Sequence, residues 1–302
     1  MSHIQSPVTT KQNPLSHDYQ EDDDRALITS SLEGNKAALN LLLKKHEPYI
    51  YNIAWKMVLN PEIALDITQE VMLKVVTRLS SFRGESSFRT WLYSIAFRHF
   101  LNMKRAKTES FVTDFDSSAD RLNSIEDHPL SPEEQLIYAE ETEEIRIRCT
   151  SGMLLCLNRE QRLIFILGEI FEVEQQTAAE LLGISSGNFR VKLHRARKDL
   201  QSYMLRQCGL VNPENACRCS KKTKSMIKMG IVDPKSRLFN KENLDNIAAW
   251  AVNSSQYLKE KSDTQQQLIF QTHKFQNQFS TLDIADLILE HPELTGKFTW
   301  NN

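Results

Sequence analysis

The residues best suited to binding another molecule are the cations of one segment, Thr177 to Arg197, with the sequence TAAELLGISSGNFRVKLHRAR. Gly183 supplies the backbone freedom that a sharp turn between two helices needs, and Ser185 is a favoured N-cap for the second helix. In that second helix an apolar stripe recurs at helical spacing and leaves cations on the opposite side. The stripe is Phe189, Leu193, Ala196 and Leu200, and the cationic side is Arg190, His194, Arg197 and Lys198. A helix-turn-helix with a basic outer side is typical of DNA binding. An ordinary amphipathic surface helix is the alternative.

A second surface that could contact nucleic acid is expected on a helix from about residue 88 to 105, which follows Ser86 and Ser87. Its inward side is predicted to carry Phe88, Leu92, Ala96 and Met103, and its other side Trp91, Ser94, Arg98, Asn102 and Arg105. Bases stack on aromatic rings while arginines hold phosphates, so this second side suits a partly melted DNA strand. The competing interpretation is a Trp91 packed in the core with incidental charges around it.

A third surface belongs to the helix that Pro61 opens. Ile63, Ile67, Val71 and Val75 are expected to face inward, whereas Asp66, Gln69, Glu70, Leu73 and Thr77 gather on another side. A polar patch that includes a leucine indicates docking of a partner protein. A merely solvated helix face is the alternative.

The sequence contains no constellation that indicates catalysis. It lacks a glycine-rich phosphate loop, paired histidines on one helix, and a serine or cysteine nucleophile with a nearby base. We therefore expect a protein that is not an enzyme and that needs no cofactor. Cys208, Cys217 and Cys219 could ligate zinc together with His273 or His291, but their spacing fits no standard zinc knuckle. We expect no metal there, and keep metal binding or redox sensing by these thiols as the alternative.

Composition places the chain among soluble proteins of about two or three domains. It has 302 residues, of which 40% are hydrophobic and 25% charged, and a net charge of −2. No segment is long and apolar enough to span a bilayer, and the N-terminal residues do not resemble a signal peptide. The five cysteines do not form the framework of a disulfide-rich secreted domain. We expect a cytoplasmic protein with reduced thiols and no membrane partner.

Hydrophobic periodicity is helical throughout and no strand is convincing, so the predicted fold class is all-α. The expected parts are a disordered arm (1–21), a helical domain (22–107), an acidic linker (108–130), a second helical domain with the helix-turn-helix (131–206) and a helical C-terminal extension (207–302). The extension begins with a basic run that could add to DNA contact or be solvated, and continues with three amphipathic patterns. The run is Lys221, Lys222, Lys224 and Lys228, and the patterns centre on residues 244–251, 268–275 and 282–289.

Several of these segments, in this order, resemble the extracytoplasmic-function sigma factors of bacterial RNA polymerase. The run PEIALDITQEVMLKVVTRLSSFRGESSFRTWLYSIAFRHFLNMKR resembles sigma region two, and LNREQRLIFILGEIFEVEQQTAAELLGISSGNFRVKLHRARKDL resembles region four. The phrases DITQEV, FRGESSFRTWLYSIA and LHRAR are close to the family wording at matching positions. The resemblance covers roughly the first two-thirds of the chain and implies a subunit that directs polymerase to promoters.

The resemblance also implies roles for individual residues. Asp66, Gln69 and Glu70 match the contact with the core polymerase, and Trp91, Arg98, Asn102 and Arg105 match the surface that melts and holds the minus-ten element. Candidates for the minus-thirty-five element are Ser186, Asn188, Arg190, Lys192, His194 and Arg195, with Asn188 and Arg190 suited to base edges and Lys192 and Arg195 to phosphates. Where the family commonly has Ala-Arg-Asn-Arg, this chain has Ala96-Phe97-Arg98-His99, which leaves its minus-ten preference open.

The implied partners are core RNA polymerase and promoter DNA, and the family admits an anti-sigma factor as a further partner. The acidic linker could follow the path of nascent RNA through the polymerase or be a solvated tether. Two other functions stay in view. One is a helix-turn-helix regulator that binds DNA without polymerase, and the other is an adaptor that acts through its C-terminal helices.

Overall fold

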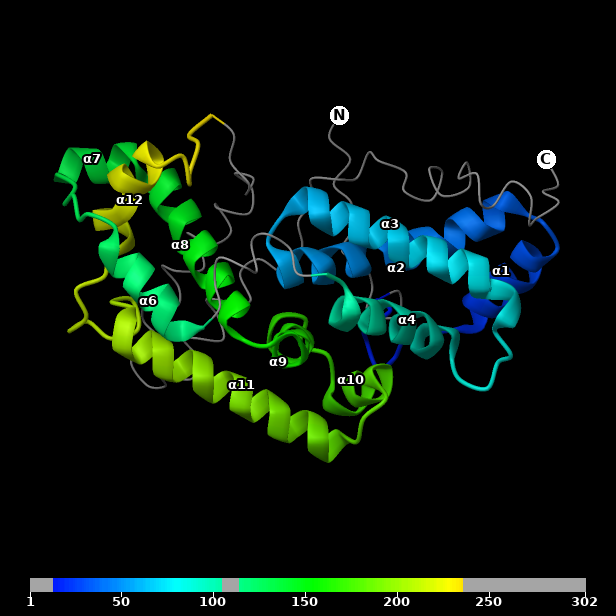
Figure 1. Cartoon of the computed structure of the whole chain (residues 1–302). Coiled ribbons are helices and arrows are strands. Elements are labelled where there is room, and N and C mark those ends of the chain that lie inside the picture. The colour runs from blue at the N-terminus through cyan, green and yellow to red at the C-terminus, as the bar shows by residue number, and fades with distance from the viewer. Residues whose placement is uncertain (1–12, 105–113, 236–302) are drawn as a thin grey trace. The chain divides into compact units, whose positions relative to one another are not determined.

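Helices form the architecture of the chain, as the sequence predicted. The computed structural model describes residues 13–104 and 114–235, and within these ranges the regular elements are helical apart from an isolated bridge between Cys208 and Cys217 (Figure 1). In chain order they are α1 (Asp22–Leu32), α2 (Lys36–Val58), α3 (Pro61–Arg78), η2 (Leu79–Ser81), α4 (Phe88–Asn102), α6 (Phe115–Ser124), α7 (Pro132–Ile137), α8 (Ala139–Met153), η3 (Leu154–Cys156), α9 (Arg159–Phe165), η4 (Ile166–Ile170), α10 (Gln175–Leu182), α11 (Ser186–Gln207) and α12 (Cys219–Lys228).

The described helices fall into two compact units. One unit holds residues 13–104 and 166–192, and the other holds residues 114–165 and 193–235. These units do not follow the predicted domain boundaries, because residues 166–192 of the predicted second domain are grouped with the first. The grouping reflects packing of α10 against α4, where the Thr90 hydroxyl donates a hydrogen bond of 2.8 Å to Glu180.

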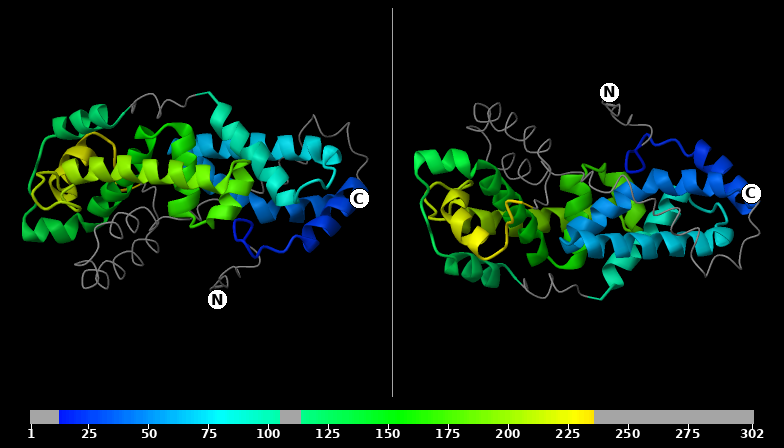
Figure 2. Two further views of the ribbon diagram at one scale, coloured as in Figure 1. Left: turned by 90° about the horizontal axis from the view of Figure 1, so that it is seen from below. Right: turned by 90° about the horizontal axis from the view of Figure 1, so that it is seen from above.

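In the first unit, α2 and α3 lie side by side along most of their length (Figure 2). Local chemistry explains where α3 and α4 begin. The side chain of Asn60 accepts a hydrogen bond of 2.9 Å from the backbone N–H of Ile63, and Pro61 occupies the first helical turn, where its missing N–H costs nothing. Ser87 caps α4 in the same way, through a 3.1 Å bond from the N–H of Thr90.

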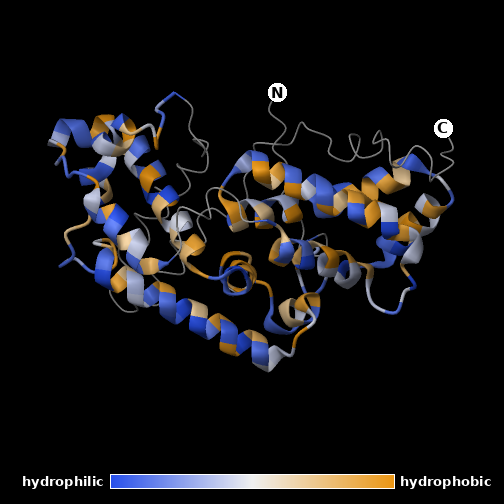
Figure 3. Ribbon diagram, in the orientation of Figure 1, coloured by the Kyte–Doolittle hydropathy of each residue, from blue (hydrophilic) through white to orange (hydrophobic). Residues whose placement is uncertain are grey.

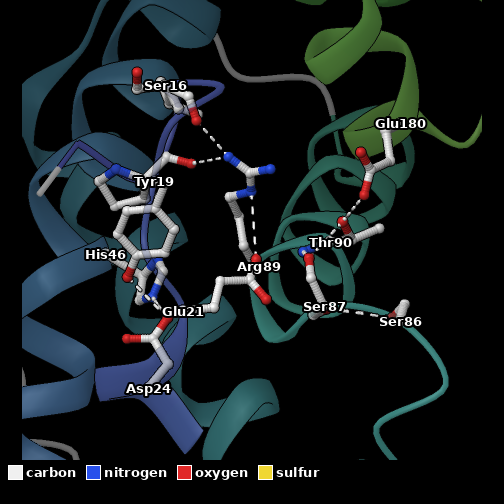
Figure 4. A network of polar contacts seen from close by, with 12 residues as sticks. Ser16, Tyr19, Glu21, Asp24, His46, Ser86, Ser87, Arg89, Thr90 and Glu180 are labelled. Atoms are coloured by element: carbon white, nitrogen blue, oxygen red, sulfur yellow. Dashed lines mark hydrogen bonds and ion pairs between the residues drawn. The ribbon is translucent and has the colours of Figure 1, made fainter. Parts of the chain in front are cut away.

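Residues 13–21 lie against this unit, in contrast to the disordered arm predicted for residues 1–21. Leu15 and Tyr19 are buried, and the guanidinium of Arg89 donates to the carbonyl of Ser16 at 2.5 Å (Figure 4). Packing of these two side chains supplies the apolar burial that offsets the entropy of ordering the segment. The sequence did not reveal it because the apolar residues are too few to show a period.

A buried polar cluster joins this N-terminal segment to α1 and α2. The Tyr19 hydroxyl donates to Asp24 at 2.8 Å, and Lys45 pairs with the same carboxylate at 2.6 Å. Burial by itself would raise the pKa of Asp24, but bonds from His46, Lys45 and Tyr19 outweigh it and lower the pKa. The cluster therefore holds a carboxylate in its charged form inside the unit.

In the second unit, the predicted acidic linker contains the helix α6. The ring of Phe115 packs against Tyr203 of α11 with centroids 5.1 Å apart, and the Tyr203 hydroxyl bonds to Ser118 at 3.2 Å. Ala119 is buried as well. Part of the linker is thus helical and packed within this unit.

The first described part of the C-terminal extension also belongs to the second unit. Helix α12 packs on α8, where Ile145, Met226 and Val232 form a buried apolar cluster, and Thr142 bonds to Thr223 across the two helices at 2.9 Å. The three amphipathic patterns further along lie outside the described residues.

Two lysines of the basic run are paired with acids, one in the acidic linker and one in α7. Lys222 is buried, donates to the carbonyl of Ile125 and pairs with Asp127 at 2.8 Å. Lys224 pairs with Glu134 at 2.5 Å. Neither predicted role, an added DNA contact or a solvated face, fits Lys222, because its ammonium is already held inside the protein.

No helix in the described ranges is long and apolar enough to cross a membrane.

Candidate nucleic-acid interface

The helix-turn-helix is present at the predicted residues. Gly183 ends α10 with φ of +66°, in the left-handed region that favours glycine. The Ser185 side chain accepts a hydrogen bond of 3.2 Å from the N–H of Asn188, so it caps α11. Gln175 at the start of α10 donates to the carbonyl of Ser186 at 3.1 Å and fixes the two helices to each other across the turn.

Helix α11 has the two sides that its sequence predicted. Phe189, Leu193, Ala196 and Leu200 are buried, whereas Asn188, Arg190, His194 and Arg195 are exposed and Ser186 and Lys192 are half-buried. Figure 3 shows hydrophobic and hydrophilic residues alternating along the helix. The exposed side therefore offers amides for base edges and cations for phosphates.

One exposed residue on this helix was missed by the sequence argument. Val191 is 46% exposed and lies between Arg190 and Lys192. Charge and hydrogen-bonding capacity guided the choice of candidates, so an apolar side chain gave no signal. Apolar contact with a thymine methyl is nonetheless an ordinary means of reading sequence in the major groove.

The candidate surface on α4 is only partly exposed. Trp91 is half-buried, with its ring centroid 5.4 Å from that of Phe82 and 5.7 Å from that of Phe88. The core-packed and the surface interpretation of Trp91 are therefore each correct in part. Arg98 and Asn102 are exposed, and the Asn102 amide donates to the carbonyl of Arg98 at 2.8 Å. Arg105 lies outside the described residues.

The polar patch on α3 is exposed as predicted. Asp66 and Glu70 are exposed, and Gln69 is half-buried. The Glu70 carboxylate lies 3.8 Å from Lys74 on the same helix and 3.6 Å from Nε2 of His99 on α4. The patch on α3 and the surface on α4 are therefore joined through His99.

His99 is one of the three residues, with Phe97 and Arg98, at which the chain departs from the family wording, and the sequence assigned it no role. Its Nδ1 lies 2.6 Å from Nζ of Lys74. Burial and the Lys74 charge lower the pKa of His99, and Glu70 opposes this effect. The neutral ring can accept a hydrogen bond from the lysine, so the arrangement favours an uncharged His99.

The three C-terminal thiols have a fourth neighbour that the spacing argument missed. The backbones of Cys208 and Cys217 pair in the isolated β-bridge, and their thiols are free. Cys219 begins α12. Cys149 of α8 lies close enough to Cys219, Cys208 and Cys217, and also to Cys156, for their thiols to raise its pKa. Because Cys149 is far from Cys208, Cys217 and Cys219 in the sequence, their spacing gave no indication that it lies near them. The described His, Cys, Asp and Glu side chains do not include a group of three or more already set to hold a metal ion.

Comparison with known proteins connects these surfaces to one family. The family model described as Sigma-70 region 2 matches residues 42–109, and the model described as Sigma-70, region 4 matches residues 147–200. Neither model extends past residue 200.

Individual relatives agree with the family models. The RNA polymerase sigma factor YlaC of Bacillus subtilis is 31% identical over 163 residues, which are 54% of this chain and 90% of the relative. The ECF RNA polymerase sigma-E factor of Haemophilus influenzae is 26% identical over 184 residues, 59% of this chain and 94% of the relative. A solved structure of CnrH in complex with the cytosolic domain of CnrY aligns with a TM-score of 0.40 and 20% identity, covering 61% of this chain and 97% of that one.

Proposed function

The chain belongs to the extracytoplasmic-function sigma factors of RNA polymerase, and from this membership we propose how its surfaces divide the work of starting transcription. A sigma factor binds core RNA polymerase and directs it to promoters. Region 2 recognises and melts the minus-ten element, and the helix-turn-helix of region 4 recognises the minus-thirty-five element. The chain is a regulatory subunit, and we assign the chemistry of RNA synthesis to the polymerase alone.

Helix α11 is the proposed reader of the minus-thirty-five element. Asn188 and Arg190 contact base edges, because an amide and a guanidinium can each make paired hydrogen bonds there. Lys192 and Arg195 supply charge to phosphates, with Ser186 and His194 at the border of the contact. The exposed Val191 adds an apolar contact beside Arg190. The buried stripe of the same helix supports this orientation, because it fixes which side is free for DNA.

The surface on α4 is the proposed site for the melted minus-ten strand. Arg98 and Asn102 are exposed and can reach phosphates and base edges, and Arg105 continues the series in the sequence. Trp91 offers one exposed part of its ring while Phe82 and Phe88 hold the remainder. A ring held in this way loses little rotational freedom when a base stacks on it.

Asp66, Gln69 and Glu70 on α3 form the proposed contact with core polymerase. Carboxylates and an amide on one exposed side of a helix can pair with basic side chains of a partner. The domain boundaries, a cytoplasmic location alongside the polymerase, and binding of an anti-sigma factor complete the proposal as consequences of family membership.

The observation that carries the assignment is the exposed cationic side of α11 above a buried stripe, in a chain that also presents the α3 and α4 surfaces. The test mixes the purified full-length protein with sigma-free core polymerase and a promoter library, and maps transcript starts. We expect stimulated initiation at positions fixed relative to shared minus-ten and minus-thirty-five sequences. Absence of such starts, with site-specific DNA binding that needs no polymerase, would support the stand-alone regulator instead.

The role of the α3 patch has its own test. Replacing Asp66 and Glu70 together by their amides should weaken binding to core polymerase about tenfold, because each loses a charge at a charge-complementary contact. The substitution Asp23→Asn, on an exposed acid of α1, is the matched control and should leave binding unchanged. Equal weakening by both would indicate a non-specific effect of net charge.

A further inference from the structure

Four cysteines from separate segments gather in the second unit. Cys149 lies on α8, Cys208 directly after α11, Cys217 in the loop that follows, and Cys219 at the start of α12. All four are half-buried and free of disulfides. The remaining cysteine, Cys156, has a different environment, with its thiol bonded to Ser118. A thiol cluster drawn from the family-matched region and the extension is therefore built into the fold.

The backbone holds three of these cysteines in one short loop. The backbones of Cys208 and Cys217 pair in the isolated β-bridge, and the N–H of Gly209 donates to the carbonyl of Cys217 at 3.1 Å. The Asn215 amide donates to the carbonyl of Cys208 at 3.2 Å, and Arg218 donates to the carbonyl of Cys217 at 3.0 Å. A Cβ at position 209 would collide with the Cys217 carbonyl and the Arg218 guanidinium, so the close approach requires glycine.

Packing of α12 on α8 brings Cys149 to this loop. Cys219 packs against the cluster that contains Ile145, and Cys149 lies one helical turn beyond Ile145 on the same side of α8. Thr142, two turns before Cys149, bonds to Thr223, one turn after Cys219. These pairings fit two antiparallel helices with Cys149 and Cys219 at the same end.

The thiols of this cluster are not suited to redox sensing. Burial raises the pKa of Cys149, and the thiols of Cys219, Cys208, Cys217 and Cys156 raise it further. Burial likewise raises the pKa of Cys219 to about 12, with Cys208 and Cys217 adding to the effect. Thiols with raised pKa values are poor redox sensors, since oxidation proceeds through the thiolate.

We propose that Cys149, Cys208, Cys217 and Cys219 form a structural zinc site that fastens the C-terminal extension to region 4. Four thiolates are a complete ligand set for tetrahedral zinc, with zinc–sulfur distances of about 2.3 Å. Arg146, Arg218 and Lys222 lie near the cluster, as do the carboxylates Glu143 and Asp127, which pair with Arg146 and Lys222. On binding, the four thiol protons pass to solvent and four sulfur–zinc bonds replace them.

The side-chain arrangement in the structure does not already place three ligands around one point. Ligation therefore requires the thiols to move, and each cysteine side chain can turn about its single torsion, χ1. The site is closed, with no ligand left for water, and so has no catalytic role. Its expected effect is to hold the loop after α11 and the start of α12 against α8.

The experiment measures metal in the full-length protein purified under reducing conditions. We expect about one zinc per chain, and titration of the thiols with an organomercurial should release it as four of the five thiols react. Replacement by Co²⁺ should give thiolate-to-cobalt charge transfer and the visible bands of tetrahedral sulfur coordination. Both measurements use the wild-type chain, so they do not depend on the folding of a variant.

Matched serine variants locate the ligands. Cys149→Ser and Cys219→Ser should each lower zinc content several-fold, whereas Cys156→Ser should retain about one zinc per chain. Zinc far below one per chain in the reduced wild-type protein overturns the proposal, as does a disulfide between Cys208 and Cys217 in its place. Equal zinc loss in the Cys156→Ser variant also contradicts the assigned ligand set.

Discussion

Nζ of Lys74 on α3 lies 2.6 Å from Nδ1 of His99 on α4. This contact joins the helix proposed to dock on polymerase to the helix proposed to hold the melted strand. Since Glu70 of the docking patch lies 3.6 Å from the other ring nitrogen, the imidazole is held from both sides. The two proposed surfaces of region 2 thus share one half-buried support, His99.

This arrangement predicts a pH dependence of stability. Burial and Lys74 lower the pKa of His99, so the unfolded chain takes up a proton at a higher pH than the folded chain. The stabilising contribution is present above the ordinary histidine pKa of about 6.5 and is lost as the pH falls below it. Urea unfolding at a series of pH values should show this loss, and His99→Gln should make it smaller. An identical pH profile in the variant would contradict the assignment.

Gly183 should be required for its backbone conformation. Its φ of +66° places it where an L side chain is strained, although a Cβ there would meet no atom within 4 Å. Gly183→Ala should lower the free energy of unfolding by about 1–2 kcal/mol. Gly187→Ala is the matched control, since that glycine is also in open space but within helix α11 and without positive φ. It should change stability by less than about 1 kcal/mol, in the stabilising direction.

Lys222 should contribute to stability through its partners. Lys222→Ala leaves the Ile125 carbonyl without this donor and Asp127 without this cation, and should cost about 1–3 kcal/mol in chemical denaturation. Lys228→Ala, on an exposed lysine of the same helix, should change stability by less than about 0.5 kcal/mol. Similar effects of the two substitutions would rule out a special role for the buried ammonium.

Arg190 and Lys192 should differ in how they affect promoter binding by the holoenzyme. Arg190→Ala should cost about 1–3 kcal/mol and relax the preference at one base pair. Lys192→Ala should weaken binding to every sequence alike and reduce the slope of affinity against salt by about 1. Binding titrations on promoter variants at several salt concentrations separate the two effects. The division fails if both substitutions cause equal losses on all sequences.

The sequence predicted elements whose evidence is local. The stripe from Phe189 to Leu200 follows the helical period, and the turn at Gly183 needs only its own residue type, so both were correct. The exposed acids on α3 followed from the apolar stripe of that helix for the same reason.

Features that depend on distant partners could not be predicted in this way. Helix α6 lies in a polar stretch, and its packing relies on Tyr203, which belongs to another helix. Cys149 has no local signal that connects it to Cys208 and Cys219. The ordering of residues 13–21 depends on contacts with Arg89. In each case the deciding interaction joins residues that are far apart in the chain.

The pairing of two α12 lysines with acids of the linker and of α7 changes how the charge of the chain should be understood. In the sequence the acidic linker and the basic run look like separate segments for outside partners or for solvent, but Lys222 and Lys224 are the counterions of Asp127 and Glu134. A chain cut after Arg206 would keep those acids and lose their cations. Its added negative field would slow the approach of DNA even though the reading helix is intact. The truncated chain would therefore bind DNA more slowly, as if a DNA-binding segment had been removed, even if the extension makes no contact with DNA.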